Sequence, residues 1–422
     1  MTPSSSPASG PAPVTGAGLS WLPAAEHVAL ICFVLASLLS YFMLQTSIIA
    51  LTALVAIETW RRGAKIAISW REPVILWLFF VLAMLAVTLV RGAWEGLERL
   101  WPFLTPAVCQ LALDHTGDAR RRVARAFVAA AVLISIYAVV QSFTGIDFLL
   151  IGAEPRPLQR WMGGHLYKAD GFFRHHAILA ISLIPAWFVA LKLFTEKRSA
   201  ARAAPLLAIG LGLLSTGSLT GLAGWAVGLG VFIGVRFLPR RLELAVLVAA
   251  LALPAALIAL SYTLPRVPGT VAARHYIWGV AARVLPETHL LGGGSASFRL
   301  RAEALMREDP ELVFKPSYSM LTTRTGDKVG VNVKHSHNQF LDILLEGGAA
   351  ALAAFIAFLW MLIRNLRRAS LVRRAPLLAL VFGVVITFYS DCPFKHHNSL
   401  FVLCFAFAYC LHLAREPEHE PA

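Results

Sequence analysis

The feature that most constrains this chain is a series of apolar runs, each about 20 residues long, separated by polar segments. A helix of about 20 apolar residues crosses the hydrocarbon core of a bilayer and satisfies its own backbone hydrogen bonds there. The composition, 57% hydrophobic and 15% charged, agrees with this. We therefore predict an all-α polytopic integral membrane protein with about twelve transmembrane helices. The predicted spans are 24–43, 45–60, 73–90, 98–113, 123–143, 175–195, 204–216, 218–236, 242–264, 338–363, 375–391 and 396–413.

Basic residues are concentrated in every second short loop between these runs. The positive-inside rule places such loops, and with them both chain termini, on the cytoplasmic side. Much of the net charge of +14 is explained in this way, and no cluster of basic and aromatic residues indicates nucleic-acid binding. Membrane lipids are the expected surroundings. The basic loops are 61–71, 120–125, 192–202, 236–241 and 364–374.

The same pattern divides the chain into tails, spans and a large outer loop. The first part is rich in Ser, Pro, Ala and Gly, which predicts a disordered cytoplasmic tail. It is not predicted to be a cleavable signal peptide, because it lacks the positive start of one. Spans one to nine follow, then a large loop on the outer side, then spans ten to twelve and a second cytoplasmic tail. In chain order these parts are 1–22, 23–264, 265–337, 338–413 and 414–422.

Two long polar segments fall on the outer side, at about 144–174 and at 265–337, and nine of the thirteen histidines are expected on that side, within these segments or at the outer ends of the spans. Within the second segment, residues 270–298 show helical spacing of apolar residues, which predicts short amphipathic helices on the membrane surface. Gly292–Gly294 form a predicted loop whose bare backbone can approach a ligand closely. No Lys-Ser/Thr pair follows these glycines, so a nucleotide-binding P-loop is not indicated.

His337 is the strongest candidate for chemistry, at the junction of the large outer loop and the tenth span. A histidine exchanges protons near neutral pH, and here it can meet a substrate whose lipid tail lies in the bilayer. A single histidine at such a boundary more often has a structural role. However, Asn338, Asp342 and Glu346 follow at four-residue spacing and share one helix face. Acidic groups inside a membrane helix are costly, and this cost favours a functional pocket.

A metal site is the rival interpretation of His335 and His337. We expect the two rings to point to opposite sides of an extended chain, and no cysteine or carboxylate spacing completes a ligand set. Four of the five cysteines fall in apolar runs and only Cys392 looks exposed, so neither a disulfide nor a thiolate site is indicated. We predict no metal and no cofactor.

Arginines in the two outer segments are candidates for binding an anion. The first segment carries Arg160 and Arg174, and the second carries Arg274 and Arg301 among other basic residues. A guanidinium donates two parallel hydrogen bonds to a phosphate, so arginines from separate loops can clamp a pyrophosphate. For any one of them, a solvated position or a contact with lipid phosphates is the more common role.

Four segments together resemble the O-antigen ligase family, within the superfamily of O-antigen polymerases and ligases. The most specific element is the pair His337–Asn338, which directly follows a large outer loop and precedes a glycine at Gly348. The segments are GFFRHHAILA (171–180), STGSLTGLAGWAVG (215–228), RHYIWGVAARVLPETHLLGGGSASF (274–298) and HNQFLDILLEGG (337–348).

The resemblance implies a GT-C-like glycosyltransferase of the bacterial inner membrane with a periplasmic active site. Its donor would be O-antigen polysaccharide on undecaprenyl pyrophosphate, and its acceptor a sugar hydroxyl of lipid A-core. No nucleotide sugar, cofactor or metal is implied.

On this basis we assign His337 as the general base that takes the proton of the acceptor hydroxyl while its oxygen attacks the anomeric carbon, with inversion. The arginines would stabilise the pyrophosphate leaving group. The first candidates for this are Arg160 and Arg274, and the second are Arg174 and Arg301. The supporting residues are Asn338, Asp391 and His335.

Other functions stay open from the sequence. An O-antigen polymerase or a protein O-oligosaccharyltransferase of the same superfamily would share the donor site and differ in the acceptor. A transporter of lipid-linked glycans would also need many helices and a cationic cavity. It would not need a base at the outer interface.

Overall fold

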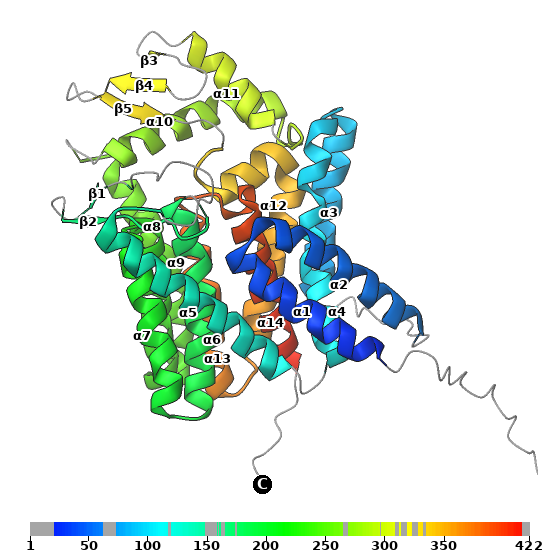
Figure 1. Cartoon of the computed structure of the whole chain (residues 1–422). Helices are drawn as coiled ribbons and strands as arrows, with labels where there is room; N and C mark the ends of the chain where they lie inside the picture. The colour runs from blue at the N-terminus through cyan, green and yellow to red at the C-terminus, as the bar shows by residue number, and fades with distance from the viewer. Residues whose placement is uncertain are drawn as a thin grey trace, which may run out of the picture.

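Helices dominate the computed structural model of the protein, and a helix overlaps each predicted span (Figure 1). The structure describes residues 21–61, 73–116, 120–147, 158, 160–161, 165–173, 175–264, 269–295, 297–308, 312–313, 319–322, 328–331 and 335–415. The α-helices are α1 (Leu22–Leu39), α2 (Tyr41–Arg61), α3 (Pro73–Val90), α4 (Thr105–Thr116), α5 (Arg120–Thr144), α6 (His176–Glu196), α7 (Ala200–Ser215), α8 (Leu219–Phe237), α9 (Arg240–Ser261), α10 (Gly269–Val284), α11 (Ser297–Arg307), α12 (Gln339–Leu366), α13 (Leu371–Thr387) and α14 (His397–Arg415). Short 3-10 helices are η1 (Trp94–Arg99), η2 (Trp101–Leu104), η5 (Pro286–Thr288) and η6 (Pro393–Lys395).

The lengths of the helices support a multi-pass membrane protein. Among the described residues, nine helices are long and apolar enough to cross a membrane: α1, α2, α3, α5, α6, α8, α9, α12 and α14. The predicted all-α polytopic class is therefore confirmed. The helices α4, α7 and α13 are shorter, at 12, 16 and 17 residues, so the count of about twelve spans remains a prediction, as does the GT-C-like arrangement.

The core of the bundle lies around α6, α13 and α14. α6 and α14 are apolar on all sides and buried along most of their length, as expected for helices surrounded by other helices. α13 packs against both α6 and α8. The approach of α8 depends on glycine, because a Cβ added at Gly224 would lie 2.5 Å from the carbonyl oxygen of Gly383.

The second long polar segment folds into a separate layer above α8, α9 and α12 in the view of Figure 1. It contains α10, α11 and a small antiparallel sheet of β3 (Leu312–Val313), β4 (Ser319–Thr322) and β5 (Lys328–Val331). The predicted amphipathic helix is α10, whose Ile277 and Ala281 pack with Phe298 and Met306 of α11 in a small apolar core. A second sheet, β1 (Arg160–Trp161) with β2 (Leu166–Tyr167), lies in the first polar segment. These strands were not predicted from the sequence.

α12 is broken by a kink at Gly348, whose backbone is left-handed in φ (76°). The loop of Gly292–Gly294 and the adjacent Leu290 form hydrogen bonds with the backbone of α12 at this kink. Gly293 N donates to Leu345 O at 2.9 Å, and Ala349 N donates to Leu290 O at 2.8 Å. The expectation that the loop approaches a ligand is thus corrected: its close contact is with the backbone of α12, which needs new hydrogen-bond partners at the kink.

Candidate functional site

A sharp turn at residues 335–338 carries the histidine pair into α12. Asn338 is the N-cap of α12, and its side-chain oxygen accepts a hydrogen bond from Leu341 N at 3.0 Å. The Ser336 hydroxyl donates to Asn338 O at 2.8 Å, which closes the turn. His337 between them has a φ of 53°, in the left-handed region. Non-glycine residues adopt this conformation only where the surrounding structure holds it, and such positions are frequent at functional sites.

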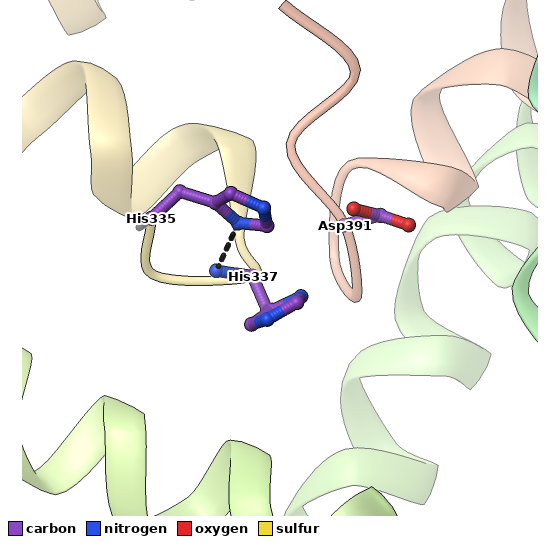
Figure 2. A group of neighbouring side chains, drawn as sticks. All are labelled: His335, His337 and Asp391. Atoms are coloured by element: carbon purple, nitrogen blue, oxygen red, sulfur yellow. Dashed lines mark hydrogen bonds between the residues drawn. The ribbon is translucent and has the colours of Figure 1, made fainter. Parts of the chain in front are cut away.

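The two histidine rings converge, contrary to the expectation from extended-chain alternation. Their centroids are 4.2 Å apart, and His337 N donates to Nδ1 of His335 at 3.3 Å (Figure 2). The expectation misapplied strand alternation, because residues two apart in an extended chain project to the same face. His335 is therefore a direct neighbour of His337 within the site.

Asp391 joins the pair from the segment that follows α13 (Figure 2). Ligand-type atoms of His335, His337 and Asp391 all lie within 4.8 Å of one another. The geometric argument against a metal site is thus corrected. Two imidazoles and a carboxylate are common metal ligands, so the absence of a metal from this site stays a prediction.

Arg274 of α10 lies in the same electrostatic environment. Its Nη2 donates to Thr220 Oγ1 at 3.4 Å, and that hydroxyl lies 3.0 Å from Ser390 Oγ. Burial lowers the pKa of Arg274, while the charge of Asp391 opposes the shift. A mostly buried guanidinium beside a carboxylate keeps its positive charge next to the histidines, as an anion site requires.

His337 is neutral in this setting. Its pKa is lowered to about 3, chiefly by burial and also by His335 and Arg274, while Asp391 and Asp342 oppose the shift. Its Nδ1 is buried and has no hydrogen-bond partner among the described residues. A neutral imidazole next to a carboxylate can accept a proton, and the carboxylate stabilises the imidazolium that forms.

Lys395 of η6 lies beneath the turn and binds two carboxylates of α12. Its Nζ lies 2.5 Å from Glu346 and 3.7 Å from Asp342. Burial alone would lower the pKa of Lys395, but Glu346 and Asp342 outweigh it and raise the pKa. The expectation that the acidic residues of α12 share a face and form a polar network is confirmed. The sequence reasoning missed Lys395, although two buried acids in an apolar helix signal that a cation must lie nearby.

A cavity of about 380 Å³ opens beside His335. Phe80, Phe103 and Phe394 form part of its apolar wall. The polar lining comprises Glu98, Arg99, Ser295, Arg299, His335, Gln339, Asp342, Glu346, Lys395, His396 and His397. Aromatic faces combined with charged hydrogen-bonding groups suit a polar organic ligand.

More histidines gather at this end of the molecule. The rings of His175 and His176, at the start of α6, stack at 4.7 Å. The ring of His396 lies 6.5 Å from that of His175 and 5.7 Å from that of His335. Three separate parts of the chain thus bring five histidines together: His175, His176, His335, His337 and His396.

The remaining predicted residues have different outcomes. Arg301 pairs with Glu287 at 3.4 Å on the layer formed by η5 and α11, and no contact between Arg301 and the site occurs among the described residues. Only the backbone of Arg160 is described, in β1, and Arg174 lies outside the described residues. Asn338 was expected to orient His337, but its amide caps α12 and donates to Tyr389 O at 3.4 Å.

Two further residues support the turn. Trp278 of α10 donates from Nε1 to Ser336 O at 2.9 Å, so the outer layer holds the turn directly. Cys392, expected to be exposed, is fully buried with its sulfur 3.9 Å from the Ser336 hydroxyl. Both contacts join residues far apart in sequence, and no local pattern predicts them.

Comparison of the chain with protein-family models finds no match, and comparison with curated proteins finds no significant one. The class is therefore defined by fold and site alone. The protein is a multi-pass α-helical membrane protein with a buried His–Asp–Arg cluster at one end of its helices.

Proposed function

We propose that the protein is an O-antigen ligase of the bacterial inner membrane. It would transfer O-antigen polysaccharide from undecaprenyl pyrophosphate to a sugar hydroxyl of lipid A-core on the periplasmic face. The observation that carries the proposal is the position of His337 at a helix end, close to His335 and Asp391 and within the electrostatic influence of Arg274. The resemblance of the His337–Asn338 segment to the ligase family supports it.

In the proposed reaction, His337 takes the proton from the acceptor hydroxyl as its oxygen bonds to the anomeric carbon. The bond from that carbon to the pyrophosphate oxygen breaks, and its electron pair leaves with the pyrophosphate, so the anomeric centre inverts. Asp391 stabilises the imidazolium that forms. For His337 to act as the base, its imidazole must be neutral before the reaction, and the lowered pKa of His337 meets that requirement.

Arg274 is the arginine best placed to stabilise the leaving group. One of its N–H groups reaches Thr220, and a guanidinium has five such donors in a planar fork, which leaves further donors for phosphate oxygens. Arg160 and Arg174 remain proposed partners from the first outer segment. Arg301 is the weakest candidate, because it is paired with Glu287.

The cavity beside His335 is the proposed site for the sugar rings next to the reacting atoms. Sugar hydroxyls form hydrogen bonds with carboxylates such as Asp342 and Glu346, and the apolar face of a sugar ring packs on aromatic side chains such as Phe394. A volume of about 380 Å³ is within the range of small-molecule sites. In this proposal the acceptor binds on the His335 side of the turn and the pyrophosphate on the Arg274 side.

The test is reconstitution of purified protein with lipid-linked glycan and lipid A-core, in chelator and without ATP, with product detected by a gel shift. Ligated product with wild type, and none with His337→Ala, supports the proposal. The control is His165→Ala, because His165 is exposed and lies in the β1–β2 hairpin. Joined lipid-linked repeats would indicate a polymerase instead, and transfer to a protein would indicate a protein ligase. Glycan crossing vesicle membranes without transfer would indicate a transporter.

A further inference from the structure

A second feature lies at the far end of α6 from the histidine cluster. His176, at the start of α6, belongs to that cluster, whereas Leu193 near its end lines an apolar groove of about 520 Å³. A helix of 21 residues is about 32 Å long, which is the thickness of a bilayer core. If α6 crosses the membrane, the groove opens in the opposite leaflet.

Small residues on α5, α6 and α7 leave room for the groove between these packed helices. Ala129 of α5, Ala190 of α6 and Ala201 of α7 line it, and Leu133 and Pro205 add branched or cyclic apolar walls. Its lining is therefore suited to a hydrocarbon chain, which fills irregular apolar space without needing hydrogen bonds.

Two arginines, Arg125 of α5 and Arg202 of α7, also line this groove. Arg202 donates from Nη1 to Leu193 O at 2.7 Å, which fixes its guanidinium at the end of α6. Among the described residues, neither arginine forms an ion pair with a carboxylate. An apolar groove with two uncompensated cations complements a molecule that has a long apolar chain and an anionic head.

We propose that the groove binds an anionic phospholipid of the bilayer, with its phosphate between Arg125 and Arg202 and an acyl chain along Ala129 and Leu133. A net-negative head group is selected because zwitterionic lipids carry a cation beside the phosphate. Free phosphate would use the arginines and leave the apolar wall uncovered. The site is independent of glycan transfer, so its failure and the failure of the ligase proposal can be told apart.

The experiment is native mass spectrometry of the full chain, delipidated in detergent and exposed to equal amounts of phosphatidylglycerol and phosphatidylcholine. Wild type should retain phosphatidylglycerol preferentially. Arg125→Gln should lower that retention about fivefold, the effect of one basic residue at an anionic surface. The matched control is Arg121→Gln, an exposed arginine one turn earlier on α5 that does not line the groove.

A second pair of variants tests the apolar wall without changing charge. Ala129→Phe fills the groove and should also reduce retention, whereas Ala256→Phe, at an exposed position on α9, should not. Unfolding midpoints show whether each variant is folded. Equal retention of both lipids by wild type overturns the proposal. So does an Arg125→Gln effect no larger than that of Arg121→Gln, normal retention in folded Ala129→Phe, or displacement of the lipid by millimolar inorganic phosphate.

Discussion

The backbone N–H of Ser336 donates a hydrogen bond to Oδ1 of Asp342 at 2.8 Å. The turn that carries His337 is therefore fixed to the first turn of α12, and through Asp342 to the cation of Lys395. An ion cluster within the helical bundle thus holds the candidate base in its left-handed conformation. The proposed chemistry depends on this support, because an imidazole displaced by even about 1 Å loses much of its effect.

Lys395→Ala tests that support. It leaves two buried carboxylates without their cation, and removing one member of a buried ion pair costs on the order of 3 kcal/mol of the free energy of unfolding. We expect a lower unfolding midpoint and reduced turnover, with partial recovery of both in Lys395→Arg. The control is Lys197→Ala, at an exposed position after α6. Unchanged stability and turnover in Lys395→Ala would show that the turn does not depend on the cluster.

Gly292→Ala tests whether the glycine loop stabilises the kink in α12. Gly292 has a φ of +87°, and an added Cβ would lie 2.6 Å from Glu346 O, so alanine combines backbone strain with a clash. We expect a loss of about 1–3 kcal/mol in the free energy of unfolding. Gly279→Ala is the matched control, because a Cβ there meets nothing within 4 Å on helix α10. Equal stabilities for the two variants would contradict the role given to the glycine loop.

Arg274→Ala tests the assignment of the leaving-group site. Removing a positioned cation from the developing charge should lower turnover by about 10²-fold or more. Arg274→Lys should recover only part of it, since an ammonium cannot make the forked contact. The control Arg301→Ala should retain turnover within a few-fold, because Arg301 pairs with Glu287. A wild-type rate in Arg274→Ala would show that another arginine holds the pyrophosphate.

The pH dependence of kcat/KM follows from the direction in which the pKa of His337 is shifted. Its pKa is lowered to about 3, so the reactive neutral form persists well below 6.5. We expect kcat/KM to stay level from pH 7 to pH 5. Asp391→Asn should move the acid limb lower still, because Asp391 favours the protonated form.

The lowered pKa of His337 also makes the free energy of unfolding depend on pH. Between pH 6.5 and about 3 the unfolded chain binds a proton that folded His337 does not, so the contribution of His337 to stability is lost as pH falls. Comparing the unfolding midpoints of wild type and His337→Gln across this pH range isolates the contribution of His337 to stability. An acid limb of kcat/KM centred near pH 6.5 would contradict the lowered pKa.

Sequence patterns predicted the helical class well, because hydropathy over about 20 residues reports directly on the cost of exposing backbone to lipid. They also placed Asp342 and Glu346 on one face, since helical spacing is a local property. The cation that neutralises them, Lys395, comes from another segment, and only tertiary packing brings it there.

The candidate site was predicted in part. Arg274, Asp391 and His335 were named from the sequence, and the structure brings all three toward His337. The relative direction of the two histidine rings was mispredicted, because residues two apart in an extended chain project to the same face and not to opposite faces. The left-handed backbone of His337 itself lies in a turn held by long-range contacts such as that of Trp278, which no local pattern predicts. The size of the His337 pKa shift could not be predicted from the sequence either, since it depends on burial in the folded protein.

The most direct test of the central claim is single-turnover ligation by His337→Ala, with donor binding measured on the same protein. If His337 is the general base, ligation should fall by roughly 10²–10⁴-fold while the affinity for lipid-linked glycan changes little. Ligation at the wild-type rate would contradict the assignment. A loss confined to donor affinity would instead make His337 a binding residue for the pyrophosphate.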